Sequence, residues 1–322
     1  MSQRSVLHAP PLTDFHGLLT TAPEMLELFR KVERVARTNA AVLIRGETGT
    51  GKELVAQAIH RLSPRADKPF RAVNCATFTP ELLSSELFGH VKGAFTGAVE
   101  NRPGLFKAAH GGTVFLDEVA EIPLNLQAQL LRVLQDQTFV PVGGSKPVTV
   151  DVRIVSATHR ALRHEVEAGR FREDLKYRIR VVPLYLPPLR DRAGDLEALT
   201  RHFILERNRQ EFRRVESIDS AALDAMSAYP WPGNVRELRN VIEYAFAVGE
   251  GPTLSLQDLT PELRGEMPEE APSVEPTSLE DQERRRILSA LQETGGKKAE
   301  AAEVLRMSRS TLWRKLREHG LS

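Results

Sequence analysis

Residues 46–52 read Gly46-Glu47-Thr48-Gly49-Thr50-Gly51-Lys52, which is the spacing G-x-x-x-x-G-K. An apolar run at residues 41–44, typical of a buried strand, precedes this stretch, and residues 53–62 follow it with helical spacing. In such a unit the glycines let backbone N–H groups face phosphate, while the helix N-terminus and the lysine supply positive charge. The sequence predicts a phosphate-binding loop, and a flexible glycine turn is the alternative.

The surrounding chain alternates buried strands with helices. Further apolar runs occupy residues 70–73, 113–116, 152–156 and 181–184, and helical patterns such as residues 124–135 separate them. Strands that alternate with helices favour a parallel sheet covered on both faces. We therefore expect an α/β fold around the phosphate-binding loop.

The pattern becomes helical after Pro187-Pro188, at residues 196–208, 220–227 and 235–248. Residues 265–277 hold three prolines among acids and little to bury, which predicts an extended tether. We expect the following parts: a tail at 1–14, an α/β nucleotide-binding subdomain at 15–194, a helical lid at 195–263, an acidic, Pro-rich linker at 264–280, and an all-α DNA-binding domain at 281–322.

Composition excludes several classes of protein. The 322 residues are 41% hydrophobic and 27% charged, near globular averages. The chain has no run of the roughly 18–20 apolar residues that cross a bilayer and no secretory signal, so we expect a cytoplasmic protein without a membrane partner. Cys75 is the only cysteine, which excludes an intrachain disulfide.

Charge is distributed unevenly although the net charge is only +1. Residues 262–283 carry eight acids against one base, whereas residues 284–322 carry ten Lys and Arg against four Glu. A basic end of this kind favours nucleic acid as a partner.

A second chemical signal lies at residues 111–118, where an apolar strand ends in Asp117 and Glu118. We expect Asp117 to hold Mg²⁺ or its waters and Glu118 to act as the general base that polarises an attacking water. A strand that simply ends in two solvated acids is the alternative. The position after Lys52 is Glu53 rather than a Ser or Thr that would ligate Mg²⁺.

The C-terminal residues predict a helix-turn-helix. Residues 297–305 place Ala301, Ala302, Val304 and Leu305 on one helical face, and residues 309–318 form a second helix whose buried face is predicted as Leu312, Trp313 and Leu316. A second helix rich in Arg and Lys suits the DNA major groove. The predicted DNA contacts are Arg309, Ser310, Thr311, Arg314 and Lys315; an amphipathic hairpin with a solvated basic face is the alternative.

The motif Gly93, Ala94, Phe95, Thr96, Gly97 and Ala98 places one aromatic residue among small residues and two glycines. This composition predicts a mobile loop that presents Phe95 and Thr96 to a partner, unless the aromatic ring is buried. With residues 85–90 (SELFGH) and 231–238 (WPGNVREL), the hexapeptide resembles the sigma-54-dependent activators, the bacterial enhancer-binding AAA+ proteins. The likeness runs from about Asp14 to the C-terminus.

The resemblance assigns roles to individual residues. It implies that Asn74 is a switch that holds the catalytic glutamate, that Arg172 and Arg178 reach a neighbouring subunit's nucleotide, and that Arg236 senses the γ-phosphate. Thr158 falls at the first sensor, where His159 stands in place of the usual Asn. Walker A is implied to comprise Gly46, Glu47, Thr48, Gly49, Thr50, Gly51, Lys52 and Glu53, with Walker B at Asp117 and Glu118.

The resemblance also implies what the protein does. An ATP- and Mg²⁺-dependent AAA+ motor assembles from dimers into a hexameric ring, its hexapeptide loop contacts sigma-54 in RNA polymerase holoenzyme, and a Fis-type helix-turn-helix binds enhancer DNA. About twenty residues before the AAA+ domain are too few for a regulatory domain, so we expect control by a separate protein, by regulated synthesis or by a sensory domain missing from this sequence. The alternatives are a regulator that acts by occupancy, with ATP as an oligomerisation switch, and an AAA+ unfoldase.

Overall fold

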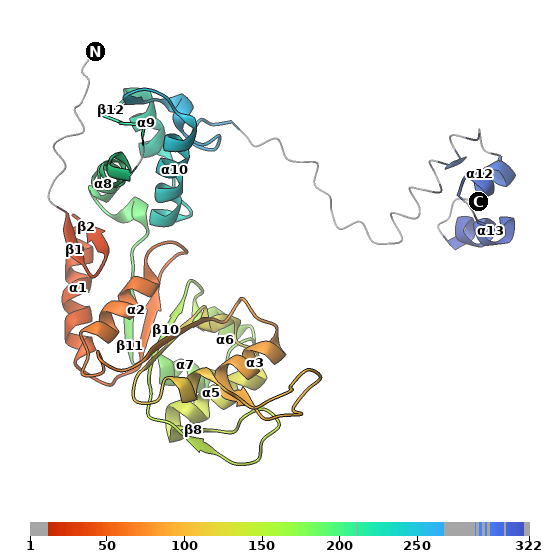
Figure 1. Cartoon of the computed structure of the whole chain (residues 1–322), viewed down its shortest axis with the longest axis horizontal. Coiled ribbons are helices and arrows are strands. Elements are labelled where there is room, and N and C mark those ends of the chain that lie inside the picture. The colour runs from red at the N-terminus through yellow and green to blue at the C-terminus, as the bar shows by residue number, and fades with distance from the viewer. Residues whose placement is uncertain are drawn as a thin grey trace. The chain divides into compact units, whose positions relative to one another are not determined.

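The computed structural model describes residues 12–210, 212–266, 287, 290, 291, 294, 297–305 and 307–318. The chain divides into two compact units, Met1–Arg264 and Gly265–Ser322, and each is described by itself (Figure 1). Most of the predicted tail and of the predicted linker lies outside the described residues. The domain boundaries given above therefore stay predictions.

A five-stranded parallel sheet forms the centre of the first unit. Its strands are β3 (Val42–Arg45), β4 (Phe70–Asn74), β7 (Thr113–Asp117), β10 (Arg153–Thr158) and β11 (Val182–Tyr185), in the order β11-β3-β10-β7-β4. Every neighbouring pair is parallel. The α/β fold expected from the alternating pattern is confirmed, with strand ends shifted by one or two residues.

Alternate residues of each strand pack on opposite faces of this sheet, as the two-residue period of a strand requires. Val42 and Ile44 join the cluster formed with α1 (Pro23–Ala36) and α2 (Lys52–Arg61). Leu43 joins the cluster on the other face. The helices of that face are α3 (Pro80–Phe88), α4 (Leu105–Ala108), α5 (Leu124–Asp136), α6 (Leu162–Glu167) and α7 (Glu173–Ile179).

Three short antiparallel hairpins accompany the sheet. They pair β1 (Thr13–Phe15) with β2 (Leu18–Thr20), β5 (Gly89–His90) with β6 (Arg102–Pro103), and β8 (Thr138–Phe139) with β9 (Val148–Thr149). Strands of two or three residues are too short to show a hydrophobic period, so the sequence did not predict them. The second hairpin carries the hexapeptide at its tip.

The lid contains α8 (Asp195–Gln210), α9 (Ser220–Ala228) and α10 (Asn234–Val248), with β12 (Ser217–Ile218) beside β13 (Thr253–Leu254). Trp231 fills its core with 1% of its surface exposed, and its indole N–H donates to the Met226 carbonyl at 2.9 Å. The helical lid predicted after Pro188 is confirmed.

The second unit contains α12 (Lys298–Val304) and α13 (Arg309–Glu318). Leu312 and Leu316 are fully buried, as predicted, but the prediction for Trp313 is wrong because 58% of its surface is exposed. Residues four apart share a helix face, whereas Trp313 lies about 100° further round, where Lys298 Nζ approaches its ring to 4.7 Å. Val304, 52% exposed, also turns away from the face of Ala301 and Ala302.

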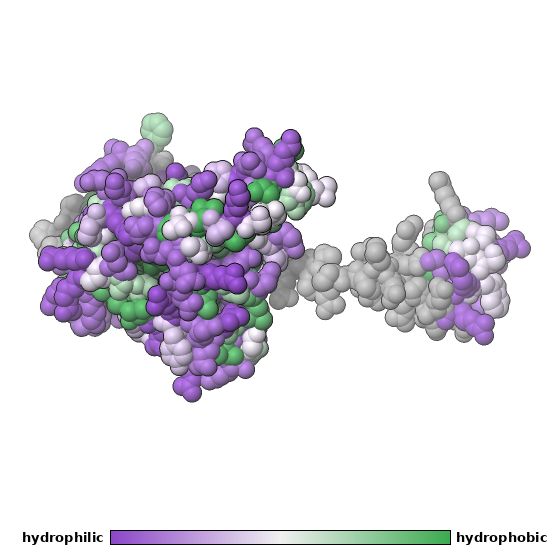
Figure 2. Space-filling model, turned by 90° about the horizontal axis from the view of Figure 1, so that it is seen from below, coloured by the Kyte–Doolittle hydropathy of each residue, from purple (hydrophilic) through white to green (hydrophobic). Residues whose placement is uncertain are grey.

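The surface in Figure 2 is largely hydrophilic, with hydrophobic residues in small patches among hydrophilic ones. Among the described residues, no helix combines the length and apolar character needed to cross a bilayer. The second unit has its own hydrophobic core, which includes Leu312 and Ala301 and is separate from the three clusters of the first unit.

Asp195, the first residue of α8, ties the N-terminal segment to the lid. Its fully buried carboxylate accepts hydrogen bonds from Thr20 Oγ1 at 2.6 Å, from the Thr21 N–H at 2.6 Å and from the Ala22 N–H at 3.1 Å. A buried carboxylate with several donors contributes strongly because each donor loses its partner when the acceptor is removed.

We expect Asp195→Ala to lower the free energy of unfolding by about 3 kcal/mol or more, since it leaves several buried donors without acceptors. Urea denaturation followed by circular dichroism measures the change. The control is Asp67→Asn at an exposed position, which should stay within about 0.5 kcal/mol of the wild type. An equal, small effect of both substitutions would contradict this role of Asp195.

Candidate functional site

The glycine-rich loop connects the end of β3 to the start of α2. Gly49 and Gly51 adopt φ angles of 79° and 102°, in the region that favours glycine, and the Gly46 N–H donates to the Thr158 carbonyl at 3.4 Å. Backbone N–H groups at the start of α2 and the adjacent Lys52 bring positive charge to one place. The loop therefore has the conformation that binds phosphate.

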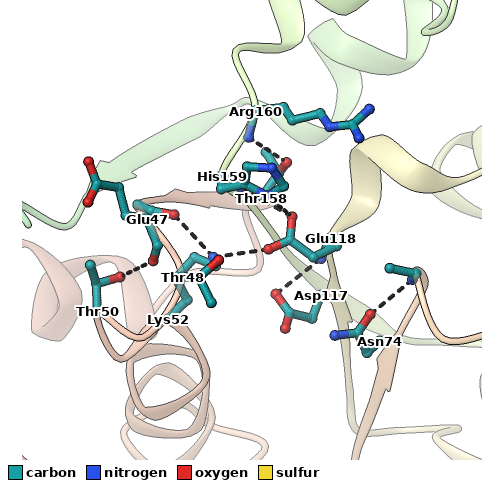
Figure 3. A network of polar contacts seen from close by, with 12 residues as sticks. Glu47, Thr48, Thr50, Lys52, Asn74, Asp117, Glu118, Thr158, His159 and Arg160 are labelled. Atoms are coloured by element: carbon teal, nitrogen blue, oxygen red, sulfur yellow. Dashed lines mark hydrogen bonds and ion pairs between the residues drawn. The ribbon is translucent and has the colours of Figure 1, made fainter. Parts of the chain in front are cut away.

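Lys52 lies in the interior, with 7% of its surface exposed, and its ammonium group bridges two partners. Nζ donates to the Gly46 carbonyl at 3.1 Å and pairs with Glu118 Oε1 at 3.1 Å (Figure 3). A phosphate group that enters the loop meets this same ammonium group. The predicted lysine and the predicted base are thus brought into direct contact.

Glu118 follows β7 in a left-handed conformation with φ 50°, which turns its side chain toward the end of β10. Oε2 lies 2.7 Å from His159 Nδ1 and accepts the His159 backbone N–H at 3.2 Å. Burial alone raises the pKa of Glu118, but the charge of Lys52 and the hydrogen bond from His159 outweigh it and hold the pKa below its usual range. The carboxylate stays ionised at neutral pH, as a general base requires.

Asp117 and Asn74 are register partners across β7 and β4. Asp117 Oδ1 accepts the Glu118 N–H at 3.0 Å, and burial followed by the charge of Glu118 raises the pKa of Asp117. Asn74 Oδ1 accepts the Ala76 N–H at 2.9 Å. The switch role requires a hydrogen bond between Asn74 and Glu118. This structure does not contain that bond, because Glu118 instead contacts Lys52 and His159.

A cleft of about 720 Å³ opens between the sheet edge and the lid. One wall is polar and is formed by the loop, the strand ends and arginines in or next to the lid, whereas the other carries apolar side chains of β2 and the lid. Such a division suits a ligand with a charged and a flat apolar end. The polar wall includes Thr48, Gly49, Thr50, Gly51, Lys52, Glu53, Asn74, Asp117, Glu118, His159, Arg192, Arg236 and Arg239, and the apolar wall includes Leu18, Leu199, Phe203 and Val235.

Three predicted nucleotide-binding residues lie beside the cleft rather than on its wall. Gly46 begins the loop, and the Glu47 carboxylate turns toward the lid, where it accepts from Arg190 at 2.6 and 2.9 Å. Thr158 is fully buried, and its Oγ1 accepts the Arg160 N–H at 3.1 Å. A direct contact of the Thr158 hydroxyl with a ligand is therefore not supported by its position.

The two predicted arginine fingers lie away from the cleft of their own chain. Arg172 forms an ion pair with Asp174 at 2.7 Å, and Arg178 donates to the Leu134 carbonyl at 3.1 Å. Both side chains lie at the surface around α7. Neither arginine lines the cleft of its own chain, and their role toward another subunit stays a prediction.

The hexapeptide forms the tip of the β5–β6 hairpin. Gly93 and Gly97 have φ angles of 82° and 101°, and the Gly93 N–H donates to the Ala98 carbonyl at 2.9 Å. Phe95 is 41% exposed and meets the ring of His90 edge-on at 5.0 Å. The loop therefore presents its aromatic ring at the surface, with Ala98 buried at its base.

The predicted DNA contacts lie at the start and along one side of α13. Ser308 Oγ accepts the Thr311 N–H at 3.1 Å and begins the helix. Arg309, Ser310 and Arg314 are exposed, while Thr311 and Lys315 are half-buried. Their role in DNA binding stays a prediction.

The sequence reasoning missed three groups of the site. Arg192 lies 4% exposed at the cleft, and Asn234, fully buried, contacts the loop from the lid. The side chain of His159 was assigned only to a sensor position, without its contact to Glu118. Asn234 stands inside the lid motif at residues 231–238, but nothing in the sequence shows where that motif packs.

The chain matches three family descriptions in order. A Sigma-54 interaction domain covers residues 18–185, an AAA+ ATPase lid domain covers residues 190–276, and the bacterial regulatory protein, Fis family, covers residues 278–319. Together these descriptions span nearly the whole chain.

Similar proteins match nearly the whole of this chain, which spans about two thirds of their own length. Regulatory protein AtoC of Escherichia coli is 45% identical over 94% of this chain and 68% of its own length, and DNA-binding transcriptional regulator NtrC of Salmonella typhimurium is 43% identical over 97% and 71%. Crystal structures of NtrX from Brucella abortus with ADP and with ATP are 38% identical to this chain, with TM-scores of 0.71 and 0.69. Each alignment covers 94% of this chain, and 70% and 69% of the respective NtrX chains. The chain therefore belongs to the sigma-54-dependent transcriptional activators, with an AAA+ ATPase domain and a Fis-type helix-turn-helix that binds DNA.

Proposed function

We propose that the cleft binds ATP and hydrolyses it, and that the released energy remodels the closed promoter complex of sigma-54 RNA polymerase holoenzyme. The contact of Lys52 with Glu118 at the mouth of the loop carries this proposal, because it unites a phosphate-binding cation and an ionised base in one site. The ADP and ATP complexes of NtrX support the nucleotide. The apolar wall around Leu18 and Phe203 suits the adenine ring.

Lys52 and Glu118 act in succession in this proposal. The phosphates of a bound nucleotide compete with Glu118 for the Lys52 ammonium group, since both are anions at the same donor. Glu118, released from Lys52 and still hydrogen-bonded to His159, then accepts a proton from the attacking water. Asn74, at the neighbouring strand end, is placed to receive Glu118 in another state as the proposed switch.

The site fits Mg²⁺ in its donor set. Mg²⁺ is held in proteins by one or two carboxylates together with substrate phosphates, and the described residues offer no larger cluster of metal ligands. Burial and the charge of Glu118 disfavour the ionised form of Asp117, a cost that a nearby cation removes. Asp117 would hold the ion, which would neutralise charge on the phosphates.

The arginines of α7 act between subunits. Arg172 and Arg178 lie outside the cleft of their own chain, so we infer that they reach the nucleotide of a neighbour in a ring, with a hexamer as the proposed assembly. An arginine supplied in this way stabilises charge on the transferred phosphoryl group. Arg236, on the lid wall, senses the γ-phosphate of its own subunit.

The hexapeptide loop transmits the motion to the polymerase. Phe95 and Thr96 are exposed at the tip of a short hairpin, which suits contact with sigma-54. The helix-turn-helix binds enhancer DNA through Arg309, Ser310, Thr311, Arg314 and Lys315, as a dimer in the cytoplasm.

We expect Glu118→Gln to lower ATP turnover at least about 100-fold, because the amide cannot accept the proton from water. ATP binding and assembly should persist. Phosphate release and calorimetric ATP titration measure the two properties. Wild-type promoter opening by this variant would instead favour a regulator that acts by occupancy.

Mixing of variants tests the arginines in trans. Arg172→Ala and Glu118→Gln should each be inactive alone, but mixed rings should recover part of the activity, because an intact Glu118 then meets an intact Arg172 of the neighbour. Steady-state ATPase activity at fixed total protein gives the readout, and the same mixture with Arg178→Ala tests the second arginine. Turnover that stays at the level of the separate variants in assembled mixed rings would contradict the role in trans.

We expect Thr96→Ala to keep ATPase activity within about twofold of the wild type and to abolish open-complex formation, because a hydroxyl at a partner contact is remote from the hydrolytic cleft. Open complexes are scored on supercoiled promoter DNA with purified sigma-54 holoenzyme. Val99→Ala, another exposed loop residue outside the hexapeptide, is the control. An equal loss of both activities in Thr96→Ala would remove the assigned role.

A further inference from the structure

Asn234, the first residue of α10, is a buried polar residue with contacts to three segments. It is fully buried and adopts a left-handed φ of 53°. Its Oδ1 accepts the Leu189 N–H at 2.7 Å, while Nδ2 donates to the Thr48 carbonyl at 3.0 Å and to Glu47 Oε2 at 3.1 Å. Nδ2 also lies 3.3 Å from the Pro232 carbonyl. The lid thus contacts the phosphate-binding loop through one amide group.

Arg192, just before α8, makes a second contact of the same kind. It is 4% exposed, and its guanidinium group donates to the Thr50 carbonyl at 3.0 Å and to the Pro187 carbonyl at 3.0 Å. Two carbonyl groups of the loop, those of Thr48 and Thr50, are therefore fixed by side chains that belong to the lid or to its connection.

Fixing a carbonyl also fixes the N–H of the next residue. A trans peptide is planar, and its C=O and N–H groups point to opposite sides; the described chain has no cis peptide. The Gly49 N–H is thereby directed away from Asn234, and the Gly51 N–H away from Arg192. Within residues 12–210 and 212–266, neither N–H donates to a backbone or side-chain acceptor, so both are available to a phosphate group.

The backbone of the lid also touches the loop directly. A Cβ atom on Gly49 would lie 2.0 Å from the Gly233 carbonyl oxygen and 3.1 Å from Arg236 Cβ. The Glu47 carboxylate is held in addition by the guanidinium of Arg190, which lowers the pKa of Glu47. A displacement of the start of α10 must therefore displace the Thr48–Gly49 peptide.

We propose that Asn234 and Arg192 are positioning residues that aim the Gly49 and Gly51 N–H groups at the nucleotide phosphates and so couple nucleotide affinity to lid position. The inference rests on the proposed function, because it takes the loop as the nucleotide site. Coupling of this kind is reciprocal: a lid that favours nucleotide is in turn held by nucleotide.

Asn234→Asp tests the proposal. The carboxylate keeps the acceptor for Leu189 but cannot donate to Thr48, and it faces Glu47. Asn234→Ala removes the amide without adding charge. We expect both variants to weaken ADP binding about tenfold or more in calorimetric titration, because each loses a buried hydrogen bond that positions the loop. We expect KM for ATP to rise in parallel while kcat changes less than about threefold, since an interaction shared by ground and transition states alters KM.

Asn208→Asp is the matched control. Asn208 exchanges hydrogen bonds with the Val215 backbone at 2.8 and 2.9 Å inside the lid and makes no hydrogen bond to the loop. The Asn208→Asp substitution should therefore lower the unfolding midpoint without changing ADP affinity. If the Asn234 variants do not fold, Arg192→Lys, which keeps the charge but not the guanidinium geometry, must show the same loss of affinity. Unchanged ADP binding in folded Asn234 variants, or an equal loss in Asn208→Asp, would overturn the inference. A wild type that binds no ADP would overturn the nucleotide site itself.

Discussion

The parallel direction of the central strands is the constraint on which the site depends. Because β3, β10, β7 and β4 run the same way, their carboxyl ends meet at one edge of the sheet. The loop, His159, Glu118 and Asn74 lie at or just after these four ends and so become neighbours although they are far apart in sequence. In an antiparallel arrangement the same residues would divide between two edges.

The Lys52–Glu118 contact gives this edge its chemistry. Both side chains are mostly buried, with 8% and 13% exposed, so their interaction is weakly screened by solvent. Each group also has a second partner, which is Gly46 for the lysine and His159 for the glutamate. A site in which a base exchanges partners without losing all of them suits a cycle of binding and hydrolysis.

The lid and the loop are held together by the hydrogen bonds of Asn234 and Arg192 and by the close approach of Gly49 to Gly233. Asp195 extends the connection to the segment before α1, whose Leu18 lines the cleft. The loop, the lid and the segment before α1 are thus joined by direct contacts. The hexapeptide hairpin, which joins β5 to β6, lies on another part of the α/β subdomain.

The sequence by itself determined the α/β fold, the loop at residues 46–52 and the two acids at the end of β7, because short-range periodicity and motif spacing are encoded locally. The helix-turn-helix was determined in the same way, except for Trp313 and Val304, whose exposure depends on which side of each helix packs against the core. Only the tertiary structure decided that His159 contacts Glu118, that Asn74 does not, and that Asn234 and Arg192 hold the loop. These contacts join segments up to 187 residues apart, and their geometry follows from strand order and lid packing, which no local pattern specifies.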